Sequence, residues 1–250
     1  MGRLHISLDD VKGIFKVLAE DSMDSIFETR TLALLNKMHE LYGMQIGLFC
    51  TYQDGNFSLE KVSEKYVDEF RRNQNWLTFG FHCYDENLTY DRDNLNDFQR
   101  HFDRFQKQIR RITGQKNTVD ALRLHSFGGS LENCRFLREK GVKTLFTADD
   151  DRTSYYLNGI QMEQLKKMGS YYDKKEDLMF IRSCTRLEKS TDIISEIENY
   201  KNISDGMISV FTHEWQMDRN DVRKQLEACC RWDGEMSCLL YTSPSPRDGA

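Results

Sequence analysis

The chain has 250 residues, with 40 acidic and 35 basic side chains that give a formal net charge of −5 at pH 7. This acidic balance, without a stripe of Lys and Arg interleaved with aromatic residues, argues against nucleic acid as a partner. No apolar run approaches the roughly 20 residues needed to cross a bilayer, and no signal sequence precedes the first strand-like segment. We therefore expect a cytoplasmic protein without membrane insertion.

The size and composition favour one globular domain. A length of 250 residues suits a single α/β barrel, and 39% hydrophobic residues with a mean hydropathy of −0.67 exclude a fibre or a disordered chain. We expect the domain to cover residues 1–240. Residues 241–250 hold both prolines and resemble translated sequencing-adaptor read-through, so we expect a disordered tail outside the fold.

Strand-like and helix-like segments alternate along the chain. Apolar runs predict strands at residues 4–10, 44–52, 76–84, 121–127, 142–148, 178–185 and 207–215. Apolar residues at spacings of three and four predict helices at residues 24–42, 59–73, 93–113, 131–140, 162–168, 193–200 and 221–232. The polar stretch 149–177 reads as a long loop. Seven such units predict an α/β fold, a single-domain distorted (β/α)7 barrel that resembles a TIM barrel and has parallel strands.

Polar side chains gather where four of these strands end. The clusters are Asp9 with Asp10, His82 with Asp85 and Glu86, Arg123 with His125, and His213 with Glu214. Because the carboxyl ends of barrel strands meet at one mouth, we expect the clusters to be neighbours. Alternation along a strand puts Thr78, Gly80 and His82 on one face, and it puts Arg123 and His125 on one face of the next strand.

Imidazole and carboxylate donors together suit a divalent metal ion, and a catalytic site keeps one position open for water. We expect Asp10, His82 and His125 to supply this set. Such an ion lowers the pKa of water and polarises a carbonyl group, which makes amide or ester hydrolysis feasible at neutral pH. Proton transfer then needs a base and an acid. Asp9 is the candidate base, although it has the opposite strand parity to Asp10, and His213 is the candidate acid.

Each feature also has a purely structural interpretation. An Asp-Asp pair after a strand often forms a turn, and a lone histidine is more often a hydrogen-bonded structural residue than a ligand. Arg123 can simply hold a carboxylate of the barrel wall. We interpret His5, His39 and His101 as structural. Three histidines and an aspartate pair at predicted strand ends favour the hydrolytic interpretation when they are taken together.

The order of the clusters resembles the polysaccharide deacetylase superfamily, the NodB-homology fold, across residues 4–215. The segments that carry the resemblance are ISLDD, GFHCYDE, LRLHSFGG and SVFTHEW. The resemblance implies Asp9 as base, Asp10 as metal ligand, Arg123 as a residue of the catalytic site and His213 as acid. It looks closest to a divergent cytosolic branch of deacetylase-like proteins associated with surface-polysaccharide synthesis.

The sequence also departs from the pattern of this superfamily. Glu86 stands where the second motif usually has a histidine, and the Gly-Pro after the first motif and the proline of the third motif are absent. We expect His125 to be the replacement ligand. Glu86 is then either a direct ligand or a partner that orients His82.

These observations predict a metal-dependent hydrolase that removes an N-acyl or O-acyl group from a sugar or sugar-like substrate. The metal is expected to be zinc, with iron, cobalt or nickel as alternatives. Arg123 would orient Asp9 or contact the substrate. The expected partner is a carbohydrate or a sugar-nucleotide-like small molecule, bound by Asp149, Asp150, Tyr155, Tyr156, Glu214 and Trp215.

Two other functions stay open at this point. A barrel that has lost motif residues can bind a carbohydrate or a partner protein without catalysis, and barrels with similar ligand sets also host metal-dependent phosphoesterases. The sequence leaves the oligomeric state open.

Overall fold

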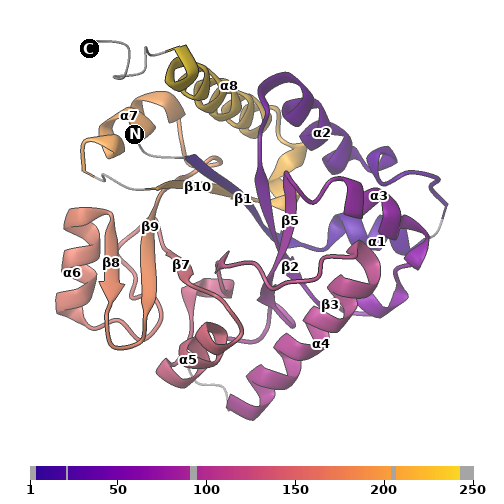
Figure 1. Ribbon diagram of the computed structural model, residues 1–250, viewed down its shortest axis with the longest axis horizontal. Helices are drawn as coiled ribbons and strands as arrows, with labels where there is room; N and C mark the ends of the chain where they lie inside the picture. Colours follow the sequence, from indigo (N-terminus) through magenta and orange to yellow (C-terminus); the bar gives the residue numbers. More distant parts are fainter. Residues whose placement is uncertain (1–3, 21, 91–94, 204–206, 243–250) are drawn as a thin grey trace, which may run out of the picture.

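Seven parallel strands form a nearly closed barrel in the computed structural model, which describes residues 4–20, 22–90, 95–203 and 207–242. Figure 1 shows the helices arranged around the outside of the strands. Around the barrel the strands follow the order β5 (Leu77–Cys83), β2 (Ile46–Thr51), β1 (Leu4–Val11), β10 (Ile208–His213), β9 (Leu178–Arg186), β7 (Thr144–Thr147) and β6 (Ala121–Leu122).

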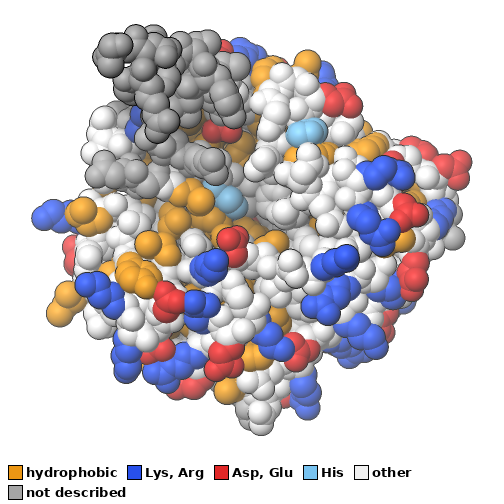
Figure 2. Space-filling view, in the orientation of Figure 1, with side chains coloured by type: hydrophobic (Ala, Val, Ile, Leu, Met, Phe, Trp, Pro, Cys, Tyr) orange, Lys and Arg blue, Asp and Glu red, His pale blue; other side chains and the backbone are white. Residues whose placement is uncertain are grey.

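Helices connect the strands and cover the barrel. They are α1 (Gly13–Ala19), α2 (Arg30–Tyr42), α3 (Val67–Arg72), α4 (Leu95–Thr113), α5 (Leu131–Glu139), α6 (Gly159–Met168), α7 (Ile193–Lys201) and α8 (Asn220–Thr242). Short 3-10 helices are η1 (Ile26–Glu28), η2 (Leu59–Lys61), η3 (Glu64–Tyr66), η4 (His125–Phe127) and η5 (Glu214–Asp218). Acidic and basic side chains are intermingled on the face shown in Figure 2. No helix of the described chain is long and apolar enough to cross a membrane.

Three antiparallel strands lie outside the parallel barrel. The hairpin β3 (Gln53–Asp54) and β4 (Phe57–Ser58) follows β2, and β8 (Ser170–Asp173) pairs with β9. β8 extends the barrel sheet at β9, whereas the hairpin forms a separate two-stranded sheet.

The predicted (β/α)7 barrel is confirmed, and all seven predicted strands are present. The predicted strand 121–127 is wrong in its second half. β6 ends at Leu122, and Ser126 and Phe127 have φ angles of 55° and 58°, which a strand cannot hold. His125 therefore lies in the turn η4 and not on a strand.

Other differences concern the helices. The predicted helix 59–73 is broken into η2, η3 and α3, and the sequence patterns did not predict α1 or β8. Of the predicted tail 241–250, residues 243–250 lie outside the described residues.

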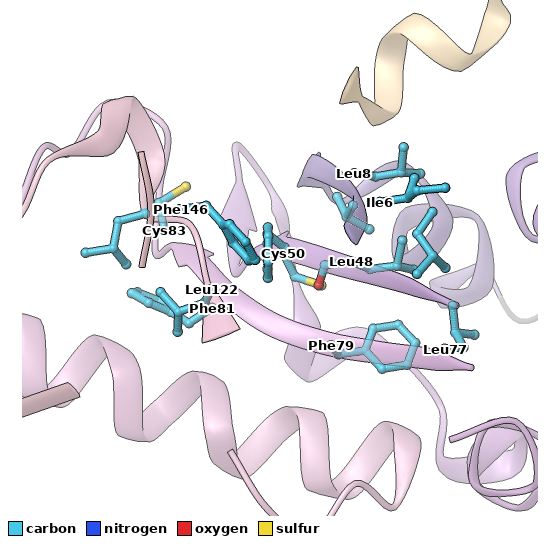
Figure 3. Close-up of a cluster of buried hydrophobic side chains, with 14 of the residues drawn as sticks. Ile6, Leu8, Leu48, Cys50, Leu77, Phe79, Phe81, Cys83, Leu122 and Phe146 are labelled. Carbon is cyan, nitrogen blue, oxygen red and sulfur yellow. The ribbon is translucent and has the colours of Figure 1, made fainter. Parts of the chain in front are cut away.

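Alternation along β5 places its side chains in two different environments. Phe79 and Phe81 lie on the outer side (Figure 3), and the ring of Phe81 is 5.3 Å from the ring of Phe105 on α4. The other face turns into the barrel. A Cβ on Gly80 would lie 2.8 Å from the ring of Phe49, so the barrel interior requires glycine here. The core thus has one layer between strands and helices and a second inside the barrel.

The barrel is open along one seam, between β5 and β6, where no ladder of backbone hydrogen bonds joins these two described strands. The side chain of Gln115 takes the place of a neighbouring strand. Its Oε1 accepts a hydrogen bond from Phe79 N at 3.0 Å, and its Nε2 donates to Phe79 O at 2.9 Å. Further along the seam, His82 Nδ1 donates to the carbonyl oxygen of Arg123 at 2.7 Å. Side chains therefore satisfy backbone groups that a closed barrel would pair.

We expect Gln115→Ala to lower the free energy of unfolding by about 2–4 kcal/mol, because it leaves a buried N–H and a buried C=O without partners. Urea denaturation followed by circular dichroism measures this loss. Asn36→Ala is the control, since that amide bonds Glu40 on a helix surface, and it should cost less than about 1 kcal/mol. Equal losses in the two variants would contradict the role of Gln115 in the seam.

Candidate functional site

The side chain of Arg123 lies inside the barrel and has no exposed surface. Its Nη1 donates to Asp9 Oδ1 and Ser7 Oγ, both at 2.9 Å, and its Nη2 donates to Ser183 Oγ at 3.0 Å and Ser209 Oγ at 3.2 Å. The guanidinium carbon also lies over three rings, those of Phe211, Phe146 and Phe49, at 4.0, 5.3 and 5.7 Å. These contacts fix the carboxylate of Asp9, so the arrangement favours the orienting role for Arg123 over direct contact with a substrate.

Asp9 and Asp10 line the same cavity although they are consecutive residues of β1. Asp10 has a φ of 55°, and the pairing of β1 with β2 shifts register between Leu8 and Val11. Such a bulge interrupts the alternation of side chains and can turn two successive residues toward one side. Aspartate tolerates a positive φ better than most residues. The opposite orientation predicted for the two carboxylates is therefore wrong.

Asp10, His82 and His125 form a group whose donor atoms all lie within 4.8 Å of one another. Asp10 Oδ1 is 3.2 Å from His82 Nε2 and 3.6 Å from His125 Nδ1. The three side chains come from β1, β5 and η4, so they are neighbours only because the barrel brings these segments together. They line a cavity of about 100 Å³ that also includes Asp9 and His213.

The contacts of His82 suit a metal ligand. Its Nδ1 faces the carbonyl oxygen of Arg123 and must carry a proton, which leaves the lone pair of a neutral ring on Nε2, toward Asp10. Burial lowers the pKa of His82, but Asp10 and Asp9 outweigh burial, and the pKa is raised. A cation beside Nε2, whether a proton or a metal ion, is therefore stabilised at this place.

The carboxylate of Asp10 fits the same interpretation. Its Oδ1 is buried and accepts no hydrogen bond of good geometry from the described residues. Burial would raise its pKa, but His125 and His82 more than compensate, and they hold the pKa of Asp10 well below its usual range. The group thus offers one carboxylate, with a charged oxygen that lacks a hydrogen-bond partner among the described residues, and two imidazoles. Zinc and similar divalent ions prefer this donor set.

His213 lies opposite Asp9 in the ladder between β1 and β10. Its Nδ1 is 2.8 Å from Glu188 Oε1, and Thr212 Oγ1 donates to the other oxygen of Glu188 at 2.7 Å. Burial lowers the pKa of His213, but Glu188 and Asp9 outweigh it and raise the pKa. The ring is thus held as an imidazolium to higher pH than a free histidine, as a proton donor requires.

Glu86 lies outside the group formed by Asp10 and the two histidines. Its Oε1 is 2.6 Å from Lys12 Nζ and 3.4 Å from Thr51 Oγ1. The carbonyl oxygen of Arg123, and not Glu86, holds the second nitrogen of His82. These contacts show neither of the two roles predicted for Glu86, which stay predictions.

The carboxylate of Glu214 is occupied by the backbone. It accepts hydrogen bonds from the N–H groups of Lys12, Gly13 and Ile14 at 2.8, 2.6 and 2.7 Å, at the start of α1. These bonds join η5 to the turn after β1. Glu214 also lines the cavity that includes Trp215 and Asp10, so its role in substrate binding stays a prediction.

The two tyrosines predicted to bind substrate also have structural contacts. Tyr155 is buried, and its hydroxyl donates to the carbonyl oxygen of Phe146 at 2.9 Å. The hydroxyl of Tyr156 donates to Asp173 at 2.9 Å. Both hydroxyl groups are used inside the protein, and neither tyrosine lines the cavity that holds Asp10 and the two histidines.

Asp149 and Asp150 are paired within the protein and are absent from the lining of the cavity. Their partners Arg186 and Arg152 line it instead. The sequence patterns missed these arginines and Glu188. Arg186 and Glu188 stand just after a predicted strand, so the criterion that selected the four clusters could have found them.

Trp215 is 61% exposed, and its ring stacks on His213 with centroids 5.6 Å apart. It lines a second cavity of about 240 Å³, which also includes Asp10. Trp215 thus has an exposed aromatic ring beside the group of ligand candidates, and its role in substrate binding stays a prediction.

No protein-family profile matches the chain, and no curated protein sequence does. Solved structures do match. A mutant of a CE4 family pseudoenzyme from Bacillus anthracis, with restored enzymatic activity, is 10% identical, with a TM-score of 0.52 over 94% of this chain and 63% of that one. A family 4 acetyl xylan esterase from Clostridium thermocellum in complex with a cobalt ion is 11% identical, with a TM-score of 0.50 over 94% and 84%.

A 4-alpha-glucanotransferase from Thermococcus litoralis is 13% identical, with a TM-score of 0.52 over 91% of this chain and 37% of that one. The structural neighbours of the chain thus include the CE4 barrels, the NodB-like polysaccharide deacetylases of the predicted resemblance. The chain spans less than two thirds of the length of the pseudoenzyme. At these identities the likeness concerns the fold, which hosts different chemistries.

We expect Arg123→Met to lower the free energy of unfolding by about 3–5 kcal/mol, because it leaves the charge of Asp9 buried without its partner. Denaturant titration at neutral pH measures the loss, and adding Asp9→Asn to the same chain should recover part of it. Arg138→Gln, which breaks a surface ion pair with Asp177, should cost less than about 1 kcal/mol. A similar small loss for Arg123→Met would contradict the central role of this side chain.

Proposed function

We propose that the protein is a metal-dependent hydrolase that removes an N-acyl or O-acyl group from a sugar or sugar-like substrate. One observation carries the proposal: Asp10, His82 and His125 meet in a cavity that also holds Asp9 and His213. A ligand set, a carboxylate base and an imidazolium acid are the parts that such a hydrolysis needs. The CE4 fold supports the same assignment, since esterases are found among its members.

Asp10, His82 and His125 would hold the metal, and zinc suits their mixture of oxygen and nitrogen donors. When bound, the ion would supply a Lewis acid for the acyl carbonyl and lower the pKa of a water molecule toward neutrality. The esterase neighbour contains cobalt, so iron, cobalt and nickel remain part of the proposal beside zinc.

The chain's own groups would move the protons. Asp9 accepts the proton of the attacking water, and Arg123 fixes the carboxylate through the Nη1 bond at 2.9 Å. His213 donates a proton to the leaving nitrogen or oxygen of the sugar. Glu188 orients its ring and keeps it protonated, because a buried carboxylate stabilises the imidazolium.

Trp215 would provide the surface for the sugar. Its exposed ring stands next to His213 and lines the cavity that adjoins Asp10, so a sugar ring stacked on it would bring an acyl group to the ligand candidates. A carbohydrate or sugar-nucleotide-like substrate and a cytoplasmic location stay predictions of the same proposal.

The metal set is tested by elemental analysis of protein purified without chelators. We expect one divalent ion per chain in the wild type and an affinity lower by more than about 100-fold in Asp10→Asn, since loss of outer partners alone costs 10–100-fold. Glu86→Gln is the matched control, because its contacts place it outside the ligand group, and it should keep its metal. A wild type that binds no metal would leave only a carbohydrate-binding or partner-binding barrel.

Activity is tested on acylated sugars and on phosphate esters in parallel. We expect acyl hydrolysis by the metal-loaded wild type and a fall in kcat of about 10²–10⁴-fold in Asp9→Asn and His213→Ala. In Glu188→Gln, the pKa of His213 drops toward that of free histidine, so the loss of activity at alkaline pH should begin at a lower pH. Phosphatase activity that disappears in His82→Ala would overturn the assignment in favour of a phosphoesterase.

A further inference from the structure

Two arginines line the candidate site and have no task in the proposed hydrolysis. Arg152 follows β7 and Arg186 ends β9, and both border the cavity that holds Asp10 and the two histidines. The Arg186 side chain is 13% exposed and that of Arg152 is 47% exposed. Both guanidinium groups can therefore be reached from solvent.

Carboxylates hold one edge of each guanidinium. Arg186 Nε donates to Asp149 Oδ2 at 2.9 Å, and its Nη2 lies 3.1 Å from Asp150 Oδ2. Arg152 Nε and Nη2 donate to the two oxygens of Asp150 at 2.8 and 2.7 Å. Since a planar guanidinium held at two nitrogens cannot turn freely, both groups are fixed in direction before any ligand arrives.

Aromatic rings support the faces of the same two groups. The guanidinium carbon of Arg152 is 5.5 Å from the ring centre of Phe127, and that of Arg186 is 5.8 Å from the ring centre of Phe211. These two rings are 6.1 Å apart and form a small apolar cluster with Ala148. One rigid support therefore carries both arginines.

The Nη1 groups remain unused. No hydrogen bond or ion pair among the described residues involves Nη1 of Arg152 or Nη1 of Arg186, although each carries two N–H donors. Asp149 and Asp150 compensate the charges of these two arginines from outside the lining. The arginines therefore offer oriented N–H donors to the cavity rather than an excess of positive charge.

We propose that the substrate carries an anionic group, a carboxylate or a phosphate, close to its acyl-bearing position, and that Arg152 and Arg186 bind this group. The inference rests on the proposed function, because it names the substrate class of the same site. The free, oriented N–H donors of these guanidinium groups form charge-assisted hydrogen bonds with such oxygens, whereas a neutral sugar offers them only hydroxyl groups. The two arginines thus select acidic sugars over neutral ones.

The test is isothermal titration calorimetry of the zinc-loaded full chain with three probes: N-acetylglucosamine, N-acetylglucosamine 1-phosphate and N-acetylmuramic acid. The last two place a phosphate or a carboxylate beside the acyl-bearing carbon. We expect at least one of them to bind about ten-fold more tightly than the neutral sugar, since a charge-assisted hydrogen bond is stronger than one between neutral groups and ten-fold corresponds to about 1.4 kcal/mol. Which of the two binds more tightly identifies the anionic group.

Arg152→Gln should remove most of this preference and leave the affinity for the neutral probe unchanged. Arg135→Gln is the matched control, because Arg135 is 43% exposed and also pairs with both oxygens of one carboxylate, that of Glu176. It should keep the full preference. Arg186→Lys is the second variant, since lysine retains the charge but loses the planar, two-nitrogen contact with the aspartates.

Equal affinity for all three probes, or no measurable binding of either anionic probe, would overturn the inference. A preference that survives both Arg152→Gln and Arg186→Lys would also overturn it, because the metal and not the arginines would then hold the anion. A preference for the anionic probes that depends on Arg152, in a protein that hydrolyses no acyl group, would support the inference and contradict the proposed hydrolase.

Discussion

The buried guanidinium of Arg123 is the constraint on which the rest of the site depends. A charge removed from water costs several kcal/mol unless paired, so the barrel interior must supply acceptors for it. It does so with Asp9 and with serines of β1, β9 and β10. The interiors of such barrels are usually filled with branched apolar side chains, whereas small hydroxyl residues at these three positions accept hydrogen bonds from this cation. The ion pair between Arg123 and Asp9 therefore stabilises the barrel interior and also orients the carboxylate of Asp9, the candidate base.

Much of this arrangement follows from local patterns. Alternation of period two correctly placed His82 on the inner face of β5 and the phenylalanines of that strand on the outer face, because this period is a property of any regular strand. Parallel strand order also predicted that Asp10, His82 and His125 converge at one mouth, and they do. The route differs for two of them, because His125 lies in η4 and Asp10 lies in a bulge of β1.

The rest depends on contacts between distant segments, which one-dimensional patterns cannot show. The segment ALRLHSF reads as one strand through Phe127. The backbone oxygen of Phe127 instead accepts a hydrogen bond from Tyr155 N at 2.7 Å, and its φ of 58° lies outside the strand region. Glu214 looked like a site residue because it follows His213, yet its partners lie about 200 positions earlier in the chain. The bulge at Asp10 likewise depends on the pairing of β1 with β2, so the segment ISLDD alone does not predict it.

The seam between β5 and β6 gives the candidate site an additional property. His82 lies on β5, at one side of the seam, and His125 follows β6, at the other side. Their rings are 5.4 Å apart, edge to face, across the gap in the backbone ladder between these two described strands. Local opening of the barrel costs least free energy at this seam, because side chains and not a backbone ladder connect the described strands β5 and β6. A metal ion bound by both imidazoles would link the two sides of the seam and stabilise its closed state. Amide hydrogen exchange in these two strands would then slow when the ion binds, even without a substrate.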